Sequence, residues 1–246
     1  MRGVIPRFRG AWIFRAVLGR VRRAQRRIRR RVAVVDFGDL AATLPITRDF
    51  GSERGSPIDR WYIDNFLAAH SGDIRGKVLE VGERRYTELF GGEAVRQSDI
   101  LHVQEGRGAT IVGDLATGRG IPVEAFDAIV LTQTLQFIYD VRGAIGVLQR
   151  ALAPGGVLLI TVPGISQLSR YDADRWGEFW RFTAQSLERL LAERFGAANV
   201  AVRAYGNVKV TVAMLGGLAQ EDLADGDLEA IDPDYELILT ARAVRQ

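Results

Sequence analysis

The 246-residue sequence contains no cysteine and only two histidines, His70 and His102. The absence of cysteine excludes disulfide bonds, thiolate zinc sites and a cysteine nucleophile. A metal site would depend mostly on carboxylates, and no group of Asp and Glu residues has ligand-like spacing, so we expect no metal. No apolar run is long enough to span a bilayer. With 47% hydrophobic residues, the chain still has enough apolar side chains for the core of one α/β domain with extensions.

Acidic residues are absent from residues 1–31, which contain twelve arginines. The rest of the chain contains the other 21 of the 33 Lys and Arg residues and all 30 acidic residues, so its net charge is −9. This asymmetry divides the chain into a basic arm at residues 1–31, a linker or lid at residues 32–56 and an acidic globular body at residues 57–246.

Within the basic arm, apolar residues from Phe14 to Ile28 recur at helical spacing and arginines fill the other faces. Arg15 interrupts the apolar segment, which is unlike a secretory signal. Three interpretations stay open: a solvated tail, an amphipathic helix on an anionic membrane with Trp12 and Phe14 inward, or a non-specific phosphate-binding patch. No DNA- or RNA-binding module accompanies the arm, so we expect no specific nucleic acid partner. We expect a cytoplasmic location, with peripheral membrane contact as the alternative for the arm.

The body alternates between strand and helix patterns. Pro57 is typical of a helix start, and the apolar residues that follow it share one helical face. A second amphipathic pattern ends at Pro154-Gly155-Gly156. The alternation predicts an α/β fold with an open, mostly parallel, seven-stranded doubly wound sheet and helices on both faces. We expect the strands at residues 77–81, 94–99, 109–115, 126–134, 157–163, 199–205 and 235–244.

Polar residues and one glycine follow several predicted strands at their carboxyl ends. In open parallel sheets, ligands bind beyond these ends, where the strand order reverses. The sequence therefore predicts one binding rim on the sheet. We expect it to carry Glu80, Gly82, Asp99, Asp114, Thr132 and Gln133.

The body resembles class I S-adenosylmethionine-dependent methyltransferases over residues 57–246. The stretch "FDAIVLTQTLQFIYD" is similar to the fourth strand of that family and the turn after it. The stretch "LQRALAPGGVLLITVPG" is similar to the family's helix, Pro-Gly-Gly turn and fifth strand. A third stretch, "RWGEFWRFTAQSLERLL", resembles the substrate side of the subgroup that includes sugar and natural-product methyltransferases.

The loop after the first strand departs from the family pattern. The family usually has acid-x-Gly-x-Gly-x-Gly, whereas this chain has Glu80-Val81-Gly82 followed by Glu83, Arg84 and Arg85. Glycine permits close backbone approach to a cofactor, because it has no Cβ. A methionine moiety carries no pyrophosphate, so one glycine can meet this need. The alternative is an ordinary strand end.

The resemblance implies S-adenosylmethionine as the cofactor and assigns roles on the rim. Glu80 and Gly82 would border its methionine end, and Asp99 would accept hydrogen bonds from the ribose hydroxyls. Asp114 and the Leu115 backbone would contact the adenine. The remaining rim residues, Thr132 and Gln133, would line the floor near the sulfonium. For each Asp the alternative is a turn-capping residue.

The acceptor site is expected in the segment "SRYDADRWGEFWRF", where aromatic rings accompany charged side chains. Such a surface suits a sugar-like acceptor, with Asp172 as the base that removes the hydroxyl proton. The alternative is that the rings belong to the core. Two residues near the lid, Arg60 and Tyr62, are candidates for the cofactor carboxylate or the acceptor. The other candidate acceptor residues are Tyr171, Arg175, Trp176, Trp180 and Arg181.

We therefore expect a methyltransferase that acts on a small molecule or glycan, most simply by O-methylation of a sugar-like hydroxyl. One alternative is a nicotinamide-dependent oxidoreductase, which would need Gly-x-Gly-x-x-Gly after the first strand, and the chain lacks this motif. The other is a non-catalytic scaffold with a cofactor-binding fold, held at a membrane or partner by its basic arm.

Overall fold

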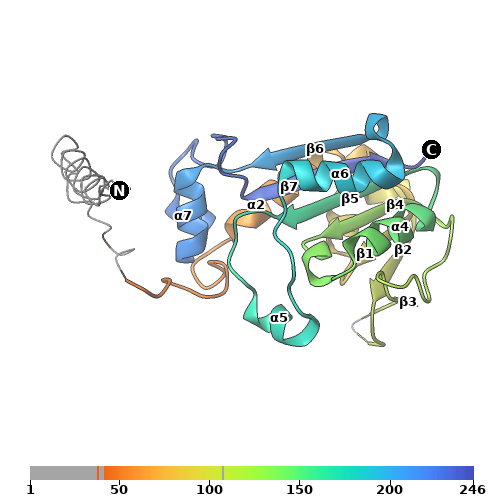
Figure 1. The fold of residues 1–246 in the computed structure, drawn as a ribbon, viewed down its shortest axis with the longest axis horizontal. Coiled ribbons are helices and arrows are strands. Elements are labelled where there is room, and N and C mark those ends of the chain that lie inside the picture. Colours follow the sequence, from red (N-terminus) through yellow and green to blue (C-terminus); the bar gives the residue numbers. More distant parts are fainter. Residues whose placement is uncertain (1–37, 39–41, 107) are drawn as a thin grey trace, which may run out of the picture. The chain divides into compact units, whose positions relative to one another are not determined.

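The computed structural model describes residue 38, residues 42–106 and residues 108–246 (Figure 1). The basic arm at residues 1–31 lies outside the described residues. Residues 44–246 form one compact unit. None of the helices in the described part of the chain is both long and apolar enough to cross a membrane.

Seven strands form a single sheet in the order β3-β2-β1-β4-β5-β7-β6. All neighbouring strands are parallel except β7, which is antiparallel to both β5 and β6. This arrangement confirms the predicted open, mostly parallel, seven-stranded sheet. The strands are β1 (Gly76–Val81), β2 (Val95–His102), β3 (Ile111–Val112), β4 (Phe126–Thr132), β5 (Leu152–Pro163), β6 (Val200–Tyr205) and β7 (Ile238–Val244).

The central strands are apolar because helices cover both faces of the sheet. In β4, the four residues from Ala128 to Leu131 are each 0% exposed. A strand covered on both faces contains a continuous apolar run, in place of the alternation seen in half-exposed strands. The same reasoning explains the apolar run "VLLITV" within β5, which pairs with β4 and β7.

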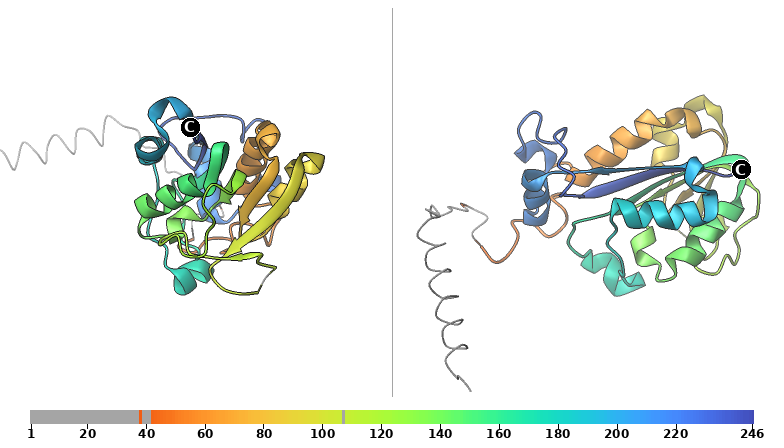
Figure 2. Two further views of the ribbon diagram at one scale, coloured as in Figure 1. Left: turned by 90° about the vertical axis from the view of Figure 1, so that its right-hand side faces the viewer. Right: turned by 45° about the horizontal axis from the view of Figure 1, so that its top comes forward.

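Helices lie on both faces of the sheet (Figure 2). On one face, α2 (Ile58–Ala69) and α3 (Arg85–Phe90) pack on the sheet through residues such as Phe66 and Leu67. On the other face, α4 (Val141–Ala151) and α6 (Ala184–Phe195) pack through Leu148 and Leu191. The predicted apolar face of α2 is confirmed, since its members are buried. The remaining helices are α5 (Arg170–Trp176), α7 (Val208–Gly216) and the 3-10 helices η2 (Ser71–Asp73), η3 (Gly92–Ala94), η4 (Leu135–Phe137), η5 (Ala197–Asn199) and η6 (Gln220–Asp222).

Several strand boundaries differ from the sequence prediction, among them β3, which covers only residues 111–112 of the predicted 109–115, and two of the differences matter for the site. The strand β2 continues to His102, three residues beyond the predicted end at Asp99, because residues 100 and 101 pair with β1. The strand β5 begins at Leu152, which pairs with Phe126, so Pro154-Gly155-Gly156 lies inside β5 rather than at the end of a helix. A bulge in the β4–β5 register between Phe126 and Ala128 accommodates this turn.

Candidate active site

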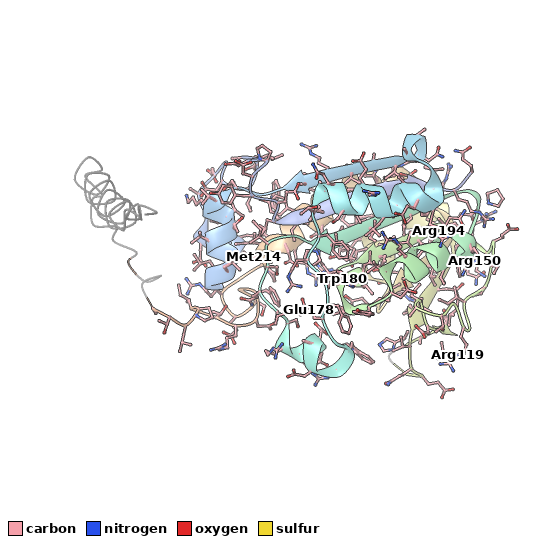
Figure 3. The ribbon with its side chains drawn as sticks, viewed as in Figure 1. Arg119, Arg150, Glu178, Trp180, Arg194 and Met214 are labelled. Carbon is pink, nitrogen blue, oxygen red and sulfur yellow. The ribbon has the colours of Figure 1, made fainter. Side chains whose placement is uncertain are left out.

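A cleft of about 900 Å³ lies at the carboxyl ends of β1, β4 and β5. Figure 1 shows α7 and the connection that contains α5 on this side of the body. Met214 of α7 and Glu178 after α5 both line the cleft and lie at this end, away from Arg119 and Arg150 (Figure 3). The order of the strands reverses between β1 and β4, so the cleft sits at the switch point where open α/β sheets bind ligands.

Glu80 is 2% exposed and joins the end of β1 to the start of α3. Its Oε1 accepts a hydrogen bond from the Tyr86 N–H at 3.0 Å. Its Oε2 accepts from the Thr87 N–H and the Thr87 hydroxyl, both at 2.7 Å. Burial raises the pKa of Glu80, while the hydrogen bonds from Thr87 and Tyr86 lower it. These contacts hold the loop between β1 and α3 in place and satisfy free N–H groups at the start of the helix.

Gly82 occupies a conformation that favours glycine, with φ of +92°. Its N–H donates to the carbonyl oxygen of Leu101 in β2 at 3.0 Å. A Cβ placed at Gly82 would have no atom of the described residues within 4 Å, so this position faces open space in the cleft. The single glycine of the loop therefore permits the backbone turn and leaves open space on the cleft side.

The floor of the cleft follows β4. Thr132 ends this strand, and Gln133 has a positive φ of +44°, which is uncommon outside glycine. The Gln133 N–H donates to the Thr161 carbonyl oxygen at 2.9 Å. Gln136 in η4 also lines the cleft, and its Nε2 donates to the Gln133 carbonyl oxygen at 2.9 Å. Backbone strain of this kind concentrates at functional sites.

Asp59 and Arg60, in the first turn of α2, form the wall above β1. The Asp59 Oδ1 atom is buried and has no hydrogen-bond partner in the described part of the chain. Burial raises the pKa of Asp59, against the opposing effect of the neighbouring Arg60 guanidinium. Arg60 Nη1 donates to the Tyr86 hydroxyl oxygen at 2.5 Å. A guanidinium and a carboxyl with an unpaired oxygen thus enter the cleft side by side.

Residues 44–56, the part of the predicted lid that belongs to the compact unit, also contribute to the cleft. Asp49 and Phe50 line it. The segment is held at its start by the Thr47 hydroxyl, which donates to the Gly217 carbonyl oxygen at 2.8 Å. A role as a lid over a cofactor stays a prediction.

The end of this segment is held more firmly. The Arg54 guanidinium donates to both carboxylate oxygens of Asp222, at 2.8 and 2.6 Å. These hydrogen bonds lower the pKa of Asp222 to about 2. The Ser56 N–H and hydroxyl both donate to the Glu221 carboxylate. Residues 54–56 are therefore bound to η6 through the carboxylates of Glu221 and Asp222.

The acceptor side of the cleft begins with Tyr171 and Asp172 of α5, both of which line it as predicted. Asp172 Oδ2 accepts from the Ser169 hydroxyl at 2.7 Å. Glu178 also lines the cleft, and its Oε2 accepts from the Ser169 N–H at 2.8 Å. Its other oxygen pairs with Arg181 at 2.7 Å. Asp172 is thus a carboxylate on the cleft wall, oriented by a serine.

Arg181 and Arg175, both predicted to bind the acceptor, are not among the residues that line the cleft. Arg181 donates to the carbonyl oxygens of Ser166 and Gln167, two residues that do line it. The guanidinium of Arg175 lies 3.6 Å from the centroid of the Tyr171 ring. Both arginines therefore support residues of the cleft wall, and a direct contact of either with the acceptor stays a prediction.

The two tryptophans predicted to form an acceptor platform also lie outside the cleft lining. Trp176 is 36% exposed and packs edge-on against His102, with ring centroids 6.1 Å apart. Trp180, also 36% exposed, donates from Nε1 to the carbonyl oxygen of Tyr139 at 3.2 Å. The alternative of a core role holds for Phe182, which is 5% exposed, but for neither tryptophan.

The placement of Asp99 at the end of the second strand is wrong, because β2 continues to His102. Asp99 lies inside the strand, is 7% exposed and does not line the cleft. Its carboxylate accepts from the Thr110 hydroxyl and the Gln97 amide, both at 2.9 Å, and pairs with Lys77 at 3.5 Å. The strand end where the ribose would bind carries His102, which lines the cleft.

Asp114 follows β3 as predicted, but it does not line the cleft. Its carboxylate accepts from the Ala116 N–H at 2.8 Å and the Thr117 hydroxyl at 2.9 Å, which is the turn-capping alternative. The side chain of Leu115 is 4% exposed and belongs to the core. Neither side chain lines the cleft, and the contact predicted for the Leu115 backbone stays a prediction.

Tyr62 is a core residue and not a cleft residue. It is 1% exposed and packs with α7 and β7. Its hydroxyl donates to the Leu228 carbonyl oxygen at 3.1 Å, and burial raises its pKa to about 12. The helical spacing of α2 turns residue 62 into the core and leaves residue 60 at the cleft.

The cleft therefore gathers about half of the predicted site residues. Among the cleft residues that were not predicted as site residues are Asp59, His102 and Gln136. The predicted residues that line the cleft are Glu80, Gly82, Thr132, Gln133, Arg60, Tyr171 and Asp172.

The charged side chains on the cleft wall are mostly acidic. Among the described residues, six carboxyl groups line it and one guanidinium, that of Arg60. A concave surface of this charge attracts cations and disfavours anions. Among the described residues, no three His, Asp or Glu side chains are grouped so that they could hold a metal ion. The carboxyl groups are those of Asp49, Asp59, Glu80, Glu83, Asp172 and Glu178.

The open sheet and the cleft at its switch point define an α/β enzyme fold of the kind that binds nucleotide-containing cofactors. The model of a family described as "Methyltransferase domain" matches residues 57–202, from the start of α2 into β6. The match spans more than half of the chain, so the chain belongs to this family. It is a class I S-adenosylmethionine-dependent methyltransferase with S-adenosylmethionine as its cofactor. The family assignment decides against the oxidoreductase and the non-catalytic scaffold.

Solved structures are similar to this chain at low identity. The N-methyltransferase NodS from Bradyrhizobium japonicum WM9, in complex with S-adenosyl-L-homocysteine, is 18% identical, with a TM-score of 0.49 over 84% of this chain and 94% of that one. An S-adenosylmethionine-dependent methyltransferase from Mesorhizobium loti is 17% identical, with a TM-score of 0.49 over 76% and 100%. One from Archaeoglobus fulgidus is 12% identical, with a TM-score of 0.49 over 76% and 94%. A comparison with curated proteins finds no sequence that matches.

Proposed function

We propose that the chain transfers a methyl group from S-adenosylmethionine to a hydroxyl of a sugar-like small molecule or glycan bound in the cleft. The observation that carries this proposal is the continuity of one cleft from the Glu80–Gly82 loop to Asp172. A cofactor against the loop and an acceptor against α5 would share one enclosed space. Most of the acceleration of methyl transfer can come from holding donor and acceptor in line.

The residues of the β1 side fit the cofactor. Gly82 leaves open space where the methionine chain would lie. The unpaired Oδ1 of Asp59 would accept from the ammonium group, and Arg60 would bind the carboxylate. His102, at the end of β2, would contact the ribose, with the Nδ1 atom already accepting a weak hydrogen bond from the Gln104 N–H at 3.3 Å. The excess of carboxyl groups suits a ligand that carries a sulfonium.

When bound, S-adenosylmethionine supplies an electrophilic methyl carbon on a positively charged sulfur. The acceptor oxygen forms a bond to this carbon as the carbon–sulfur bond breaks, and its proton must leave. Asp172 is positioned to take that proton, since it lines the cleft and is oriented by Ser169. The exposed ring of Tyr171 would contact the apolar face of the sugar.

The test is methyl transfer from labelled S-adenosylmethionine to a panel of neutral glycosides, followed by phenols and amines. We expect transfer to at least one glycoside hydroxyl, and a turnover number reduced at least about 100-fold in Asp172→Asn, because the substitution keeps the shape and removes the basicity. Asp174→Asn on the exposed side of α5 is the matched control. Transfer to amines alone would contradict the proposed acceptor, and an unchanged turnover number in Asp172→Asn would contradict the proposed base.

For residues 1–31 we propose peripheral contact with an anionic membrane from the cytoplasmic side. The support is the twelve arginines without an acid and the helical spacing of the apolar residues. The full chain should co-sediment with vesicles that contain phosphatidylserine at low salt and be released at high salt, because screening weakens surface attraction. Equal binding to neutral phosphatidylcholine vesicles, or binding to neither, would contradict this contact.

A further inference from the structure

Gln136 is held in the cleft by contacts on two sides. It lies in η4, three residues after the strained residue Gln133, and is 4% exposed. Its backbone carbonyl oxygen accepts from the Phe179 N–H at 2.8 Å, which joins η4 to the segment after α5. Its side-chain Nε2 donates to the Gln133 carbonyl oxygen at 2.9 Å. Both the position and the rotation of the amide group are therefore constrained.

The orientation of this amide leaves one acceptor atom unused. A carbonyl oxygen only accepts, so the Gln133 carbonyl oxygen requires the NH₂ end of the Gln136 amide, and the amide cannot be flipped. The Oε1 atom is then directed elsewhere. It is buried and has no hydrogen-bond partner among the described residues. A buried acceptor without a partner is costly and rare, and such a group in a binding site is explained by a ligand that supplies the missing donor.

We propose that Gln136 Oε1 accepts a hydrogen bond from a donor group of the methyl acceptor, beside the group that is methylated, and so selects the acceptor. This inference rests on the proposed function. The link to the acceptor rather than the cofactor is the Phe179 contact, because Phe179 belongs to the segment of Glu178 and Arg181 that builds the acceptor side. The acidic cleft wall restricts the donor to a neutral hydroxyl or a cationic ammonium group.

Such a contact would make the enzyme discriminate strongly between the acceptor and analogues that lack the donor group. A site built to bond a substrate hydroxyl or N–H rejects the analogue that lacks it by about 10⁴-fold or more, because its own polar group is left unpaired. We expect at least a 100-fold lower kcat/KM for the acceptor's deoxy analogue at the position next to the methylated hydroxyl. Deoxy analogues at positions remote from Gln136 should be affected far less.

The test compares three variants of the full chain. Gln136→Met keeps the length of the side chain and removes the acceptor oxygen, whereas Gln136→Glu keeps an oxygen at this position. Gln149→Met on α4 makes the same replacement outside the cleft. Each is assayed with the glycoside that the wild-type enzyme methylates and with its deoxy and amino analogues. Binding of S-adenosyl-L-homocysteine and the melting temperature are measured in parallel.

We expect Gln136→Met to raise the acceptor KM at least 30-fold, to lose discrimination against one deoxy analogue and to bind S-adenosyl-L-homocysteine within twofold of wild type. Gln136→Glu keeps an acceptor oxygen but loses the amide donor to the Gln133 carbonyl oxygen, so it should recover more activity than Gln136→Met at low pH, where its protonated carboxyl can donate. The amino analogue shows whether the preferred donor is a hydroxyl or an ammonium group. Equal damage by both variants, weakened S-adenosyl-L-homocysteine binding or retained discrimination would overturn the proposal.

The melting temperature provides a readout that needs no acceptor. Gln136→Met removes one hydrogen bond together with the unpaired oxygen, so the ligand-free protein should melt within about 3 °C of wild type. A fall of more than about 8 °C would assign Gln136 a structural role and overturn the proposal. If the wild-type enzyme methylates amines and no hydroxyl, the proposed function fails, while the same variants with desamino analogues still decide the role of Gln136.

Discussion

The two sides of the cleft are held in different ways. On the β1 side, the buried carboxylate of Glu80 accepts three hydrogen bonds from α3, and α3 packs directly on the sheet. On the α5 side, the side-chain contacts of the acidic residues run within the segment, from Glu178 to Ser169 and Arg181, and from Asp172 to Ser169. The β1 side is part of the core, whereas the α5 side is a surface segment with exposed aromatic rings, joined to η4 and its next turn by the Phe179 N–H and Trp180 Nε1.

This difference separates the two tasks of the site. The residues that would bind the methyl donor also hold the fold together, so most substitutions on the β1 side lower the stability of the protein. The acceptor side carries few core contacts, since Tyr171, Phe179 and Trp180 are 55%, 48% and 36% exposed. A surface loop on a rigid scaffold can vary its specificity at little cost in stability. Substitutions should therefore affect stability and cofactor binding on one side, and acceptor kinetics on the other.

The largest effect is expected for Glu80→Ala. The substitution leaves the Tyr86 N–H, the Thr87 N–H and the Thr87 hydroxyl without their acceptor, and we expect a loss of about 2–4 kcal/mol in the free energy of unfolding. Urea titration measures this loss, with the exposed neighbour Glu83→Ala as the control. If the Glu80→Ala protein is as stable as Glu83→Ala, the hydrogen bonds of Glu80 do not stabilise the β1 side of the cleft.

Gly82→Val should come next. The positive φ makes any β-branched residue costly by about 1–2 kcal/mol, and the side chain would enter the cleft. We expect S-adenosyl-L-homocysteine binding to fall at least about 100-fold, an effect of about 2.7 kcal/mol. Gly155→Val is the matched control, because Gly155 has a φ of +78° and also faces open space, but lies outside the cleft. Equal binding by the two variants would place the cofactor elsewhere.

Arg181→Ala tests the acceptor side. It leaves the Glu178 carboxylate without its partner and releases the carbonyl oxygens of Ser166 and Gln167. We expect the acceptor KM to rise about 10-fold, equivalent to 1.4 kcal/mol, with cofactor binding unchanged. Arg170→Ala, which breaks the exposed pair with Asp174, is the control. A parallel loss of cofactor binding would mean that the two sides are coupled.

Asp59→Asn probes the wall above β1. Burial raises the pKa of Asp59 above its ordinary value of 3.8. At a pH between these two values, the Asp59 carboxyl is protonated in the folded protein and ionised in the unfolded chain. Stability contributed by this group is therefore present at low pH and lost as the pH rises through the raised pKa. The variant should melt at a higher temperature than wild type at pH 7, with the difference vanishing near pH 3. Its binding of S-adenosylmethionine should weaken several-fold. A variant with the melting temperature and the cofactor affinity of the wild type would contradict the assigned role of Asp59.

The smallest effect is expected for Asp99→Asn and Asp114→Ala. Neither side chain lines the cleft, so S-adenosyl-L-homocysteine affinity should stay within about twofold of wild type. Calorimetric titration of each variant measures this. A loss of tenfold or more in either would restore that residue as a cofactor ligand.

The sheet could be predicted from the sequence because its central strands are uninterrupted apolar runs between helical patterns. The end of β2 could not, because Asp99 looks like a strand end, and its partners Lys77 and Thr110 are 22 and 11 positions away. Those partners stabilise a buried carboxylate inside a strand, and residues 100–102 then continue it. The residues next to Asp99 in the sequence do not indicate that Lys77 and Thr110 pair with it.

The acceptor side was predicted as a segment, but of the six residues predicted within it only Tyr171 and Asp172 line the cleft. Aromatic and charged residues alternate through it, and composition does not show which of them face the cleft. Asp172 lies on the cleft wall because Ser169 caps α5 and orients it, whereas Arg175 lies over the Tyr171 ring. The role of Arg181 depends on carbonyl oxygens of residues 166 and 167, and no side-chain pattern reveals such a partner.

The central claim is that the cofactor binds on the β1 side of this cleft, despite its single glycine. Calorimetric titration of the full chain with S-adenosyl-L-homocysteine, for the wild type and for Gly82→Val beside Gly155→Val, tests it most directly. We predict one site per chain in the wild type and in Gly155→Val, and no measurable binding in Gly82→Val. Absence of binding in the wild type up to millimolar ligand, or binding that Gly82→Val leaves intact, would contradict the account.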